Sequence, residues 1–166
     1  MTDHGFGYPR PDNWDEPTTI PDIPERMRRV LVAIDGSDHA ELGLAHAARL
    51  ATWSGAEVLV VVAFDHPVRF RRRGMLPGEA FVAQLEADAV ELGSEAVELL
   101  LQRGLTARAI AVRGEAVEAI LETAQAEDVD LVVIGRRGLG QLRDLLIGSV
   151  SDRVVSRCHR PVLVVS

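Results

Sequence analysis

Lysine is absent from this chain, and all 18 of its basic residues are arginine. The absence excludes a Walker A phosphate-binding lysine, a Schiff-base lysine and a serine–lysine catalytic dyad. Cysteine is almost absent as well. With Cys158 alone, the chain holds no intrachain disulfide, no CxxC redox pair and no cysteine-rich zinc site. The five histidines do not show the spacing of metal ligands either, so we expect no metal site built by the protein.

Long apolar runs and an excess of positive charge are also missing. No run approaches the roughly 20 apolar residues that a membrane helix needs, and the N-terminus lacks the basic-then-apolar pattern of a secretory signal. A net charge of −7 argues against a protein that wraps duplex nucleic acid through its phosphates. We therefore expect a cytoplasmic protein with neither a membrane nor a nucleic-acid partner.

The chain's length and composition are those of one globular domain with a tail. Its 166 residues, 47% of them apolar, are sufficient to bury a core. Residues 1–28 differ from the rest, because prolines and glycines stand among polar residues without a period of 2 or 3.6. This pattern predicts a disordered arm, in which Tyr8 and Trp14 are candidates to dock elsewhere. Residues 29–166 are expected to form the domain.

Buried strands and amphipathic helices alternate from residue 29 onward. Continuous apolar runs predict strands buried on both faces, at 30–34, 58–64, 131–134 and 162–165. The segment 106–112 alternates instead and predicts a less central strand. Apolar residues three or four apart predict the intervening helices, between Ser37 and Gly55, over 81–99 with a stop at Gly104, over 117–124 and over 150–158. This order predicts an α/β fold with a parallel sheet and helices on both faces.

The most informative segment follows the strand predicted at 131–134. Two residues separate Gly135 from Gly138, and nine more separate Gly138 from Gly148-Ser149. Ligands of open parallel sheets bind at the carboxyl ends of strands, where glycines allow close backbone approach. A helix beginning near Ser149 and Ser151 favours phosphate at its N-terminus. The residues alone leave two alternatives open, a phosphate site or a flexible strand-to-helix loop with capping serines.

The G-x2-G-x9-G-[ST] spacing, followed by the apolar strand after Pro161, resembles the universal stress protein family. The resemblance covers residues 29–166. Within that family, the chain is similar to the nucleotide-binding branch, because all three glycines and the serine of the motif are present. The resemblance implies a five-stranded, Rossmann-like parallel sheet in the order 3-2-1-4-5 and a pocket for ATP or a related adenine nucleotide, with or without Mg²⁺.

The resemblance also implies which residues contact the nucleotide. Ala33 and Asp35 at the end of the first strand would flank the nucleoside, and Ala63 would line the adenine. Ile134 and Gly135 would line it from the fourth strand. The phosphates would be wrapped by Gly138, Gly148, Ser149, Val150 and Ser151.

Two arginine features stand outside this set. Arg136 departs from the family, in which relatives often carry a small serine at this position, and it is expected either to pair with phosphate or to point to solvent. The basic run 69–73 lies in a long loop predicted over 65–79. It indicates a solvated loop, with a lid over the phosphates as the alternative.

The resemblance favours a non-catalytic, ATP-dependent regulator of the stress response. The alternative is a slow ATPase or nucleotide-dependent phosphotransferase. For that chemistry the carboxylates expected near the pocket are Asp35, Asp65 and Asp144, and no general base is evident. A third reading is a flavin or electron-transfer module on a similar sheet.

The apolar strand predicted at 162–165 indicates contact with a second chain. In the implied order it lies at an edge of the sheet, and natural proteins cover or pair apolar edges that carry no charged side chain. Dimers through the last strand are also common in the family. We therefore expect a homodimer about a twofold axis through 161–165, with coverage of the edge by the arm as the alternative.

Overall fold

A computed structural model of the protein describes residues 26–65, 78–138 and 148–166. Tyr8, Trp14, the basic run 69–73, Asp144 and most of the predicted arm lie outside the described residues. The described elements are β1 (Arg29–Ala33), α1 (Asp38–Ser54), β2 (Glu57–Phe64), α3 (Glu79–Leu101), β3 (Ala107–Arg113), α4 (Ala116–Ala126), β4 (Leu131–Gly135), α5 (Ser149–Arg157) and β5 (Val162–Val165).

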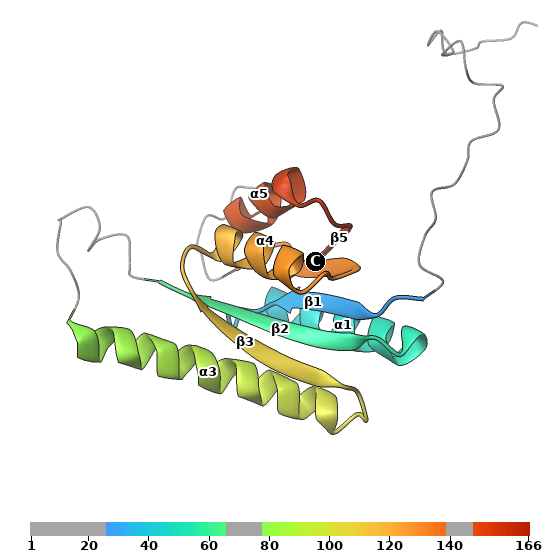
Figure 1. Ribbon diagram of the computed structural model, residues 1–166, viewed down its shortest axis with the longest axis horizontal. Coiled ribbons are helices and arrows are strands. Elements are labelled where there is room, and N and C mark those ends of the chain that lie inside the picture. The colour runs from blue at the N-terminus through green and yellow to red at the C-terminus, as the bar shows by residue number, and fades with distance from the viewer. Residues whose placement is uncertain (1–25, 66–77, 139–147) are drawn as a thin grey trace, which may run out of the picture.

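All strand pairs of the sheet are parallel, and the strand order is β3-β2-β1-β4-β5. Val32 of the central strand is in register with Val60 of β2 and Val133 of β4. The helices α1 and α3 cover one face, and α4 and α5 cover the other (Figure 1). The predicted fold class and strand order are confirmed.

The continuous apolar runs are explained by two separate core layers. In β1, Val30 and Val32 pack towards α1 and α3, whereas Leu31 between them packs towards α4 and α5. All three side chains are fully buried. A strand sandwiched between helices on both faces has no polar side, and for this reason its sequence does not alternate.

The alternating strand β3 stands at one edge of the sheet. Ile110 and Val112 pack against the core under α4 and α5, whereas Ala109 and Ala111 are exposed on the α3 side. The prediction of a less central strand is therefore confirmed.

The helix ends agree with the sequence at α1 and differ at α3. Ser37 caps α1 by accepting a hydrogen bond from the Ala40 N–H, and Gly55 ends the helix with a φ of 73°. In α3 the last helical residue is Leu101, three residues before the glycine predicted to stop it. A turn fills the gap, in which the Gly104 N–H donates to the Leu101 carbonyl, and Gly104 supplies the positive φ of 75°.

The amino ends of the strands are held by ion pairs. The backbone N–H groups of Arg28 and Arg29 both donate to Asp130 Oδ2, at 2.6 and 2.9 Å, which aligns β1 with β4. Arg108 of β3 is bonded to Glu127, and this hydrogen bond raises the pKa of Arg108. Met27 packs against the core ahead of β1. These contacts lie at the end of the sheet opposite to the glycine motif.

Candidate functional site

A cavity of about 300 Å³ opens at the carboxyl ends of β1, β2 and β4. Its other walls come from the first turns of α4 and α5. Every site residue predicted from the sequence lines this cavity: Ala33, Asp35, Ala63, Ile134, Gly135, Gly138, Gly148, Ser149, Val150 and Ser151. The parallel sheet brings them together because the carboxyl ends of its strands share one edge.

One end of the cavity is a narrow apolar slot. Ala33 and Ala63 lie on one side of it, and their small side chains leave space next to Val61 and Ile134. The opposite wall includes Ala116 and Ile120 of α4, which sequence reasoning missed. Their spacing of four residues places them on one helix face. The sequence marked the helix as amphipathic, but no signal in it shows which part of that face borders a cavity.

Asp35 stands at the mouth of the cavity, directly after β1. Its Oδ1 accepts hydrogen bonds from the Ser37 backbone N–H at 3.1 Å and from the Ser37 hydroxyl at 2.6 Å. These bonds hold the residue that caps α1. The other oxygen, Oδ2, is so close to Gly138 that a Cβ on this glycine would lie 2.2 Å from it. The carboxylate therefore supports the local fold through Oδ1 and borders the cavity as well.

The glycines of the motif are required by contacts within the chain itself. A Cβ on Gly135 would lie 2.6 Å from the carbonyl oxygen of His39 in α1. A Cβ on Gly148 would lie 2.8 Å from the carbonyl oxygen of Arg136. Both distances are shorter than Cβ contacts in proteins. Close approach was the expected role of these glycines, and the partner that the structure shows is the protein's own backbone.

The two ends of the glycine motif are tied together at Arg136. Its carbonyl accepts a hydrogen bond from the Gly148 N–H at 2.8 Å, and Ser151 Oγ lies 2.8 Å from the same oxygen. The Arg136 N–H in turn donates to the Val165 carbonyl of β5 at 2.7 Å. Ser151 is buried, and its hydroxyl bonds to the backbone carbonyls of Arg136 and Gly148 within the motif itself.

The other end of the cavity carries two arginine side chains. Arg136 and Arg137 both line the cavity, and the Nε atom of each is buried without a hydrogen-bond partner in the described part of the chain. Among the described lining residues, Asp35 is the only acid. The N-terminus of α5 points its N–H groups here and has no side-chain cap. A helix N-terminus beside two unsatisfied arginines favours an anion, and phosphate in particular.

Salt bridges hold α5 against α4 and so keep the cavity walls together. Arg153 pairs with Glu115, and Arg157 donates to Glu118 at 2.7 Å and 3.0 Å. The hydrogen bond from Arg157 lowers the pKa of Glu118 and, reciprocally, raises the pKa of Arg157. These arginines already have acidic partners, in contrast to the two in the cavity.

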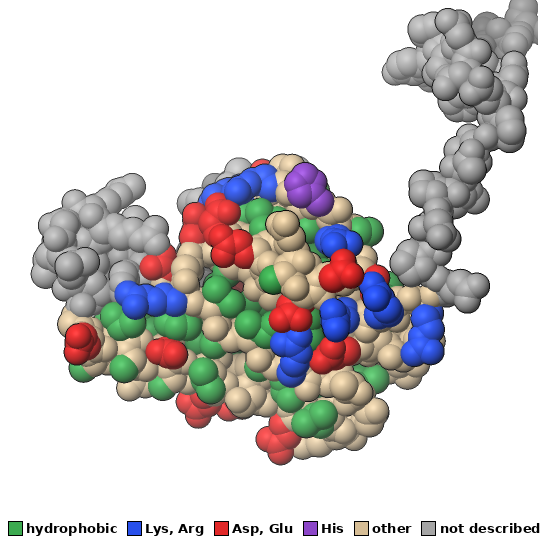
Figure 2. All heavy atoms as spheres, in the orientation of Figure 1, with side chains coloured by type: hydrophobic (Ala, Val, Ile, Leu, Met, Phe, Trp, Pro, Cys, Tyr) green, Lys and Arg blue, Asp and Glu red, His purple; other side chains and the backbone are tan. Residues whose placement is uncertain are grey.

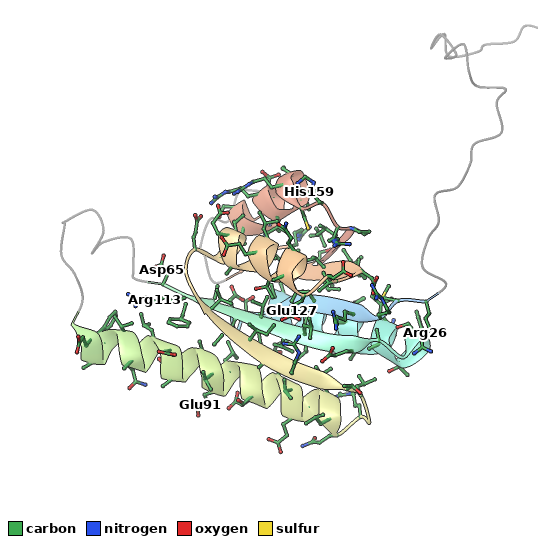
Figure 3. All side chains as sticks on the ribbon, in the orientation of Figure 1. Arg26, Asp65, Glu91, Arg113, Glu127 and His159 are labelled. Atoms are coloured by element: carbon green, nitrogen blue, oxygen red, sulfur yellow. The ribbon has the colours of Figure 1, made fainter. Side chains whose placement is uncertain are left out.

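Asp65, one of the carboxylates considered for phosphoryl transfer, does not line the cavity. It follows β2 and lies beside Arg113, the last residue of β3 (Figure 3). Within residues 26–65, 78–138 and 148–166, no group of three or more His, Cys, Asp or Glu side chains is placed to hold a metal ion. In the same ranges, no helix has the length and apolarity needed to cross a membrane.

Comparison with known proteins agrees with this geometry. The family model described as "Universal stress protein family" matches residues 27–166. A universal stress protein of Thermus aquaticus is 39% identical over 140 residues, which cover 84% of this chain and 98% of the relative. A universal stress protein solved in complex with cAMP aligns with a TM-score of 0.64 and 26% identity, over 84% of this chain and 97% of that one. One from Archaeoglobus fulgidus, in complex with dAMP, aligns with a TM-score of 0.60 and 25% identity, over 84% and 98%. This chain belongs to the universal stress protein family.

Proposed function

We propose that this protein binds an adenine nucleotide, ATP in particular, in the cavity and acts as a cytoplasmic, nucleotide-dependent regulator without turning the nucleotide over. The observation that supports this most is the polarity of the cavity: an apolar slot leads to an end where the buried Nε atoms of Arg136 and Arg137 have no hydrogen-bond partner among the described residues. Adenine is flat and apolar on its faces, and a phosphate chain is anionic. The relatives solved with cAMP and dAMP carry adenine nucleotides of the same kind.

The proposed orientation follows from the residues at each end. Adenine lies in the slot between Ala33 and Ala63, over Ile134. The ribose hydroxyls or the adenine amino group donate to the Asp35 carboxylate, which borders the cavity. The phosphates lie over the first N–H groups of α5 and beside the two arginines. With or without Mg²⁺, this orientation places the adenine at the apolar end of the cavity and the phosphates at the positive end.

The engagement of Asp35 supports a binding role over a catalytic one. Phosphoryl transfer needs a carboxylate for the metal ion and a group that positions the nucleophile. Asp35 Oδ1 accepts the two hydrogen bonds from Ser37, which caps α1, and Asp65 is not a lining residue. We therefore keep a slow ATPase or phosphotransferase as the outcome that a phosphate-release assay would reveal.

We also propose a homodimer through β5. This strand stands at the edge of the described sheet, and its Val162, Leu163 and Val164 are only half-buried. Pairing two copies of β5 about a twofold axis would cover these side chains and satisfy the outer backbone groups. The proposed arm, residues 1–28, is not needed for that contact.

Blocking the slot tests the nucleotide site. Ala63→Trp is expected to fill the adenine end of the cavity and abolish ATP binding measured by calorimetry. Ala83→Trp, the same change at an exposed position of α3, is the matched control and should bind as the wild type does. Mass spectrometry of the ligand released from the purified protein identifies the natural nucleotide, and visible absorbance would reveal a flavin instead. Undiminished ATP binding by a folded Ala63→Trp protein would refute the proposed site.

A further inference from the structure

A second apolar groove, of about 380 Å³, lies on the far side of the sheet from the nucleotide cavity. Val90, Val97 and Leu101 of α3 form one wall. Ala109 and Ala111 of the edge strand β3 form the other. The three α3 residues recur at intervals of seven and four, which places them along one stripe of the helix.

The groove is open because α3 packs closely at one line and leaves its outer side uncovered. A Cβ on Gly93 would lie 2.9 Å from the Ala109 Cβ, so helix and strand touch there. Next to that line, Val90 and Leu101 stay 49% and 53% exposed. Figure 2 shows hydrophobic side chains gathered along α3 and β3, with acidic side chains along α3 and basic ones nearer to β3.

The strand beside the groove has an unpaired edge. In the described part of the chain, β3 pairs with β2 on one side and with no strand on the other. An extended segment placed there would satisfy the outer N–H and C=O groups of β3, as in β-strand addition. Successive side chains of such a segment point to opposite faces. One set would lie in the groove over Ala109 and Ala111, where a long cationic side chain can lay its apolar stem and extend its charged end to the acids of α3. The other set would lie beside Ile110 and Val112 on the opposite face, which suits small apolar residues.

The negative charge of α3 indicates which side chains such a segment would carry. Residues 79–101 contain six acidic residues and no basic one. Glu98 is part of the groove lining, and Glu91, two turns earlier on the same helix face, projects outward from α3 (Figure 3). An apolar groove with an acidic margin is complementary to a segment that presents apolar and cationic side chains together.

The same charges argue against two other occupants. A second copy of the chain would bring one acidic α3 up to another. Residues 1–25 of the chain itself carry six acidic residues and one arginine, so they would be repelled too. We propose that the β3 edge and the α3 groove bind an extended segment of a partner protein in which arginine or lysine alternates with small apolar residues.

A titration with two short synthetic peptides tests this surface. In one peptide arginine alternates with valine, and in the other glutamate alternates with valine. The arginine peptide is expected to bind saturably, to shift backbone amide NMR signals of β3 and α3, and to lose affinity as salt is raised. The glutamate peptide is expected not to bind.

Two variants locate the binding. Ala111→Arg places a bulky cation in the groove at an exposed position, and the double variant Glu91→Gln, Glu98→Gln removes the acidic margin without adding bulk. Each should weaken the arginine peptide roughly tenfold, because exposed charge pairs are individually weak and add over several contacts. Ala83→Arg adds the same cation elsewhere on α3 and is the control.

The outcomes separate the proposal from its alternatives. Equal binding of both peptides, no saturable binding of the arginine peptide, or shifts confined to the nucleotide cavity would overturn it. A change in sedimentation caused by Ala111→Arg would show that a second copy of the chain occupies the groove, which also overturns it. ATP binding is not involved in any of these readouts, so the proposal stands or falls independently of the proposed function.

Discussion

Replacing Arg136 with methionine should weaken nucleotide binding without destabilising the fold. Within the part of the chain that the structure describes, the Arg136 Nε is buried without a hydrogen-bond partner, and an unsatisfied buried donor costs about 1–3 kcal/mol. Because the residue as a whole is half-buried, removing its guanidinium is expected to raise the free energy of unfolding by an amount near the lower limit, about 1 kcal/mol. Methionine retains an unbranched apolar stem of similar shape. The nucleotide-free variant should therefore unfold at the same temperature as the wild type or slightly above it.

The affinity for ATP should move in the opposite direction. A hydrogen bond to a charged group contributes about 1.5–3 kcal/mol, so losing one between Arg136 and a phosphate raises the Kd roughly ten- to hundredfold. Calorimetry with ATP measures this, and thermal unfolding without nucleotide measures the stability. Arg49→Met removes the same charge from an exposed position on α1 and should leave both quantities nearly unchanged, because exposed charges beyond about 8 Å are screened. Wild-type ATP affinity in Arg136→Met, or a loss of stability as large as the loss of affinity, would refute the reasoning.

Three further predictions concern Asp35, the α4–α5 contact and β5. Asp35→Ala should lower the melting temperature, because Ser37 loses its acceptor, and should weaken ATP binding by about 1–3 kcal/mol. Asp35→Asn keeps an acceptor for Ser37 and should weaken ATP binding alone. A loss of stability without a change in ATP affinity would make the carboxylate purely structural. Arg157 holds the pKa of Glu118 below its ordinary value of 4.5, so the stabilisation is present at neutral pH and is lost as the pH falls through the lowered pKa. Thermal unfolding from neutral to acidic pH should show a smaller pH dependence in Glu118→Gln, and an unchanged pH profile would count against the salt bridge. Sedimentation should show a dimer for the full chain and for a chain lacking residues 1–25; a monomer in both would contradict pairing through β5.

Gly148 is a poor position for testing ligand binding, although its place in the motif suggests it. A side chain there would meet the Arg136 carbonyl, which accepts hydrogen bonds from the same segment. A bulky substitution would move the backbone before any ligand arrived, so lost binding would say nothing about phosphate. Arg136→Met and Ala63→Trp avoid this because they change side chains that border open space.

Most of the fold was predictable because it depends on local patterns. The apolar run in β1 reports burial on both faces, and the alternation in β3 reports an edge strand that is only partly buried. Ser37 and Gly55 mark the ends of α1 by capping and by positive φ, which are properties of the residues themselves. The strand order came from the family resemblance and not from these patterns, since parallel strands of this kind can be arranged in several orders.

The sequence by itself determined that this chain forms alternating strands and helices and that its glycine motif follows a buried strand. The family resemblance carried by that motif, and not the spacing alone, implied the ten residues expected around one ligand. Tertiary structure alone decided that Ala116 and Ile120 form the opposite wall and that the glycines pack against the protein's own backbone. It also decided that, among the described residues, the Nε atoms of Arg136 and Arg137 are buried without a partner, whereas Arg153 and Arg157 have acidic partners. The reason is physical. Propensity and periodicity act between neighbours in the chain, whereas the partner of a charge and the space beside a glycine depend on segments brought together only when the sheet and its helices pack.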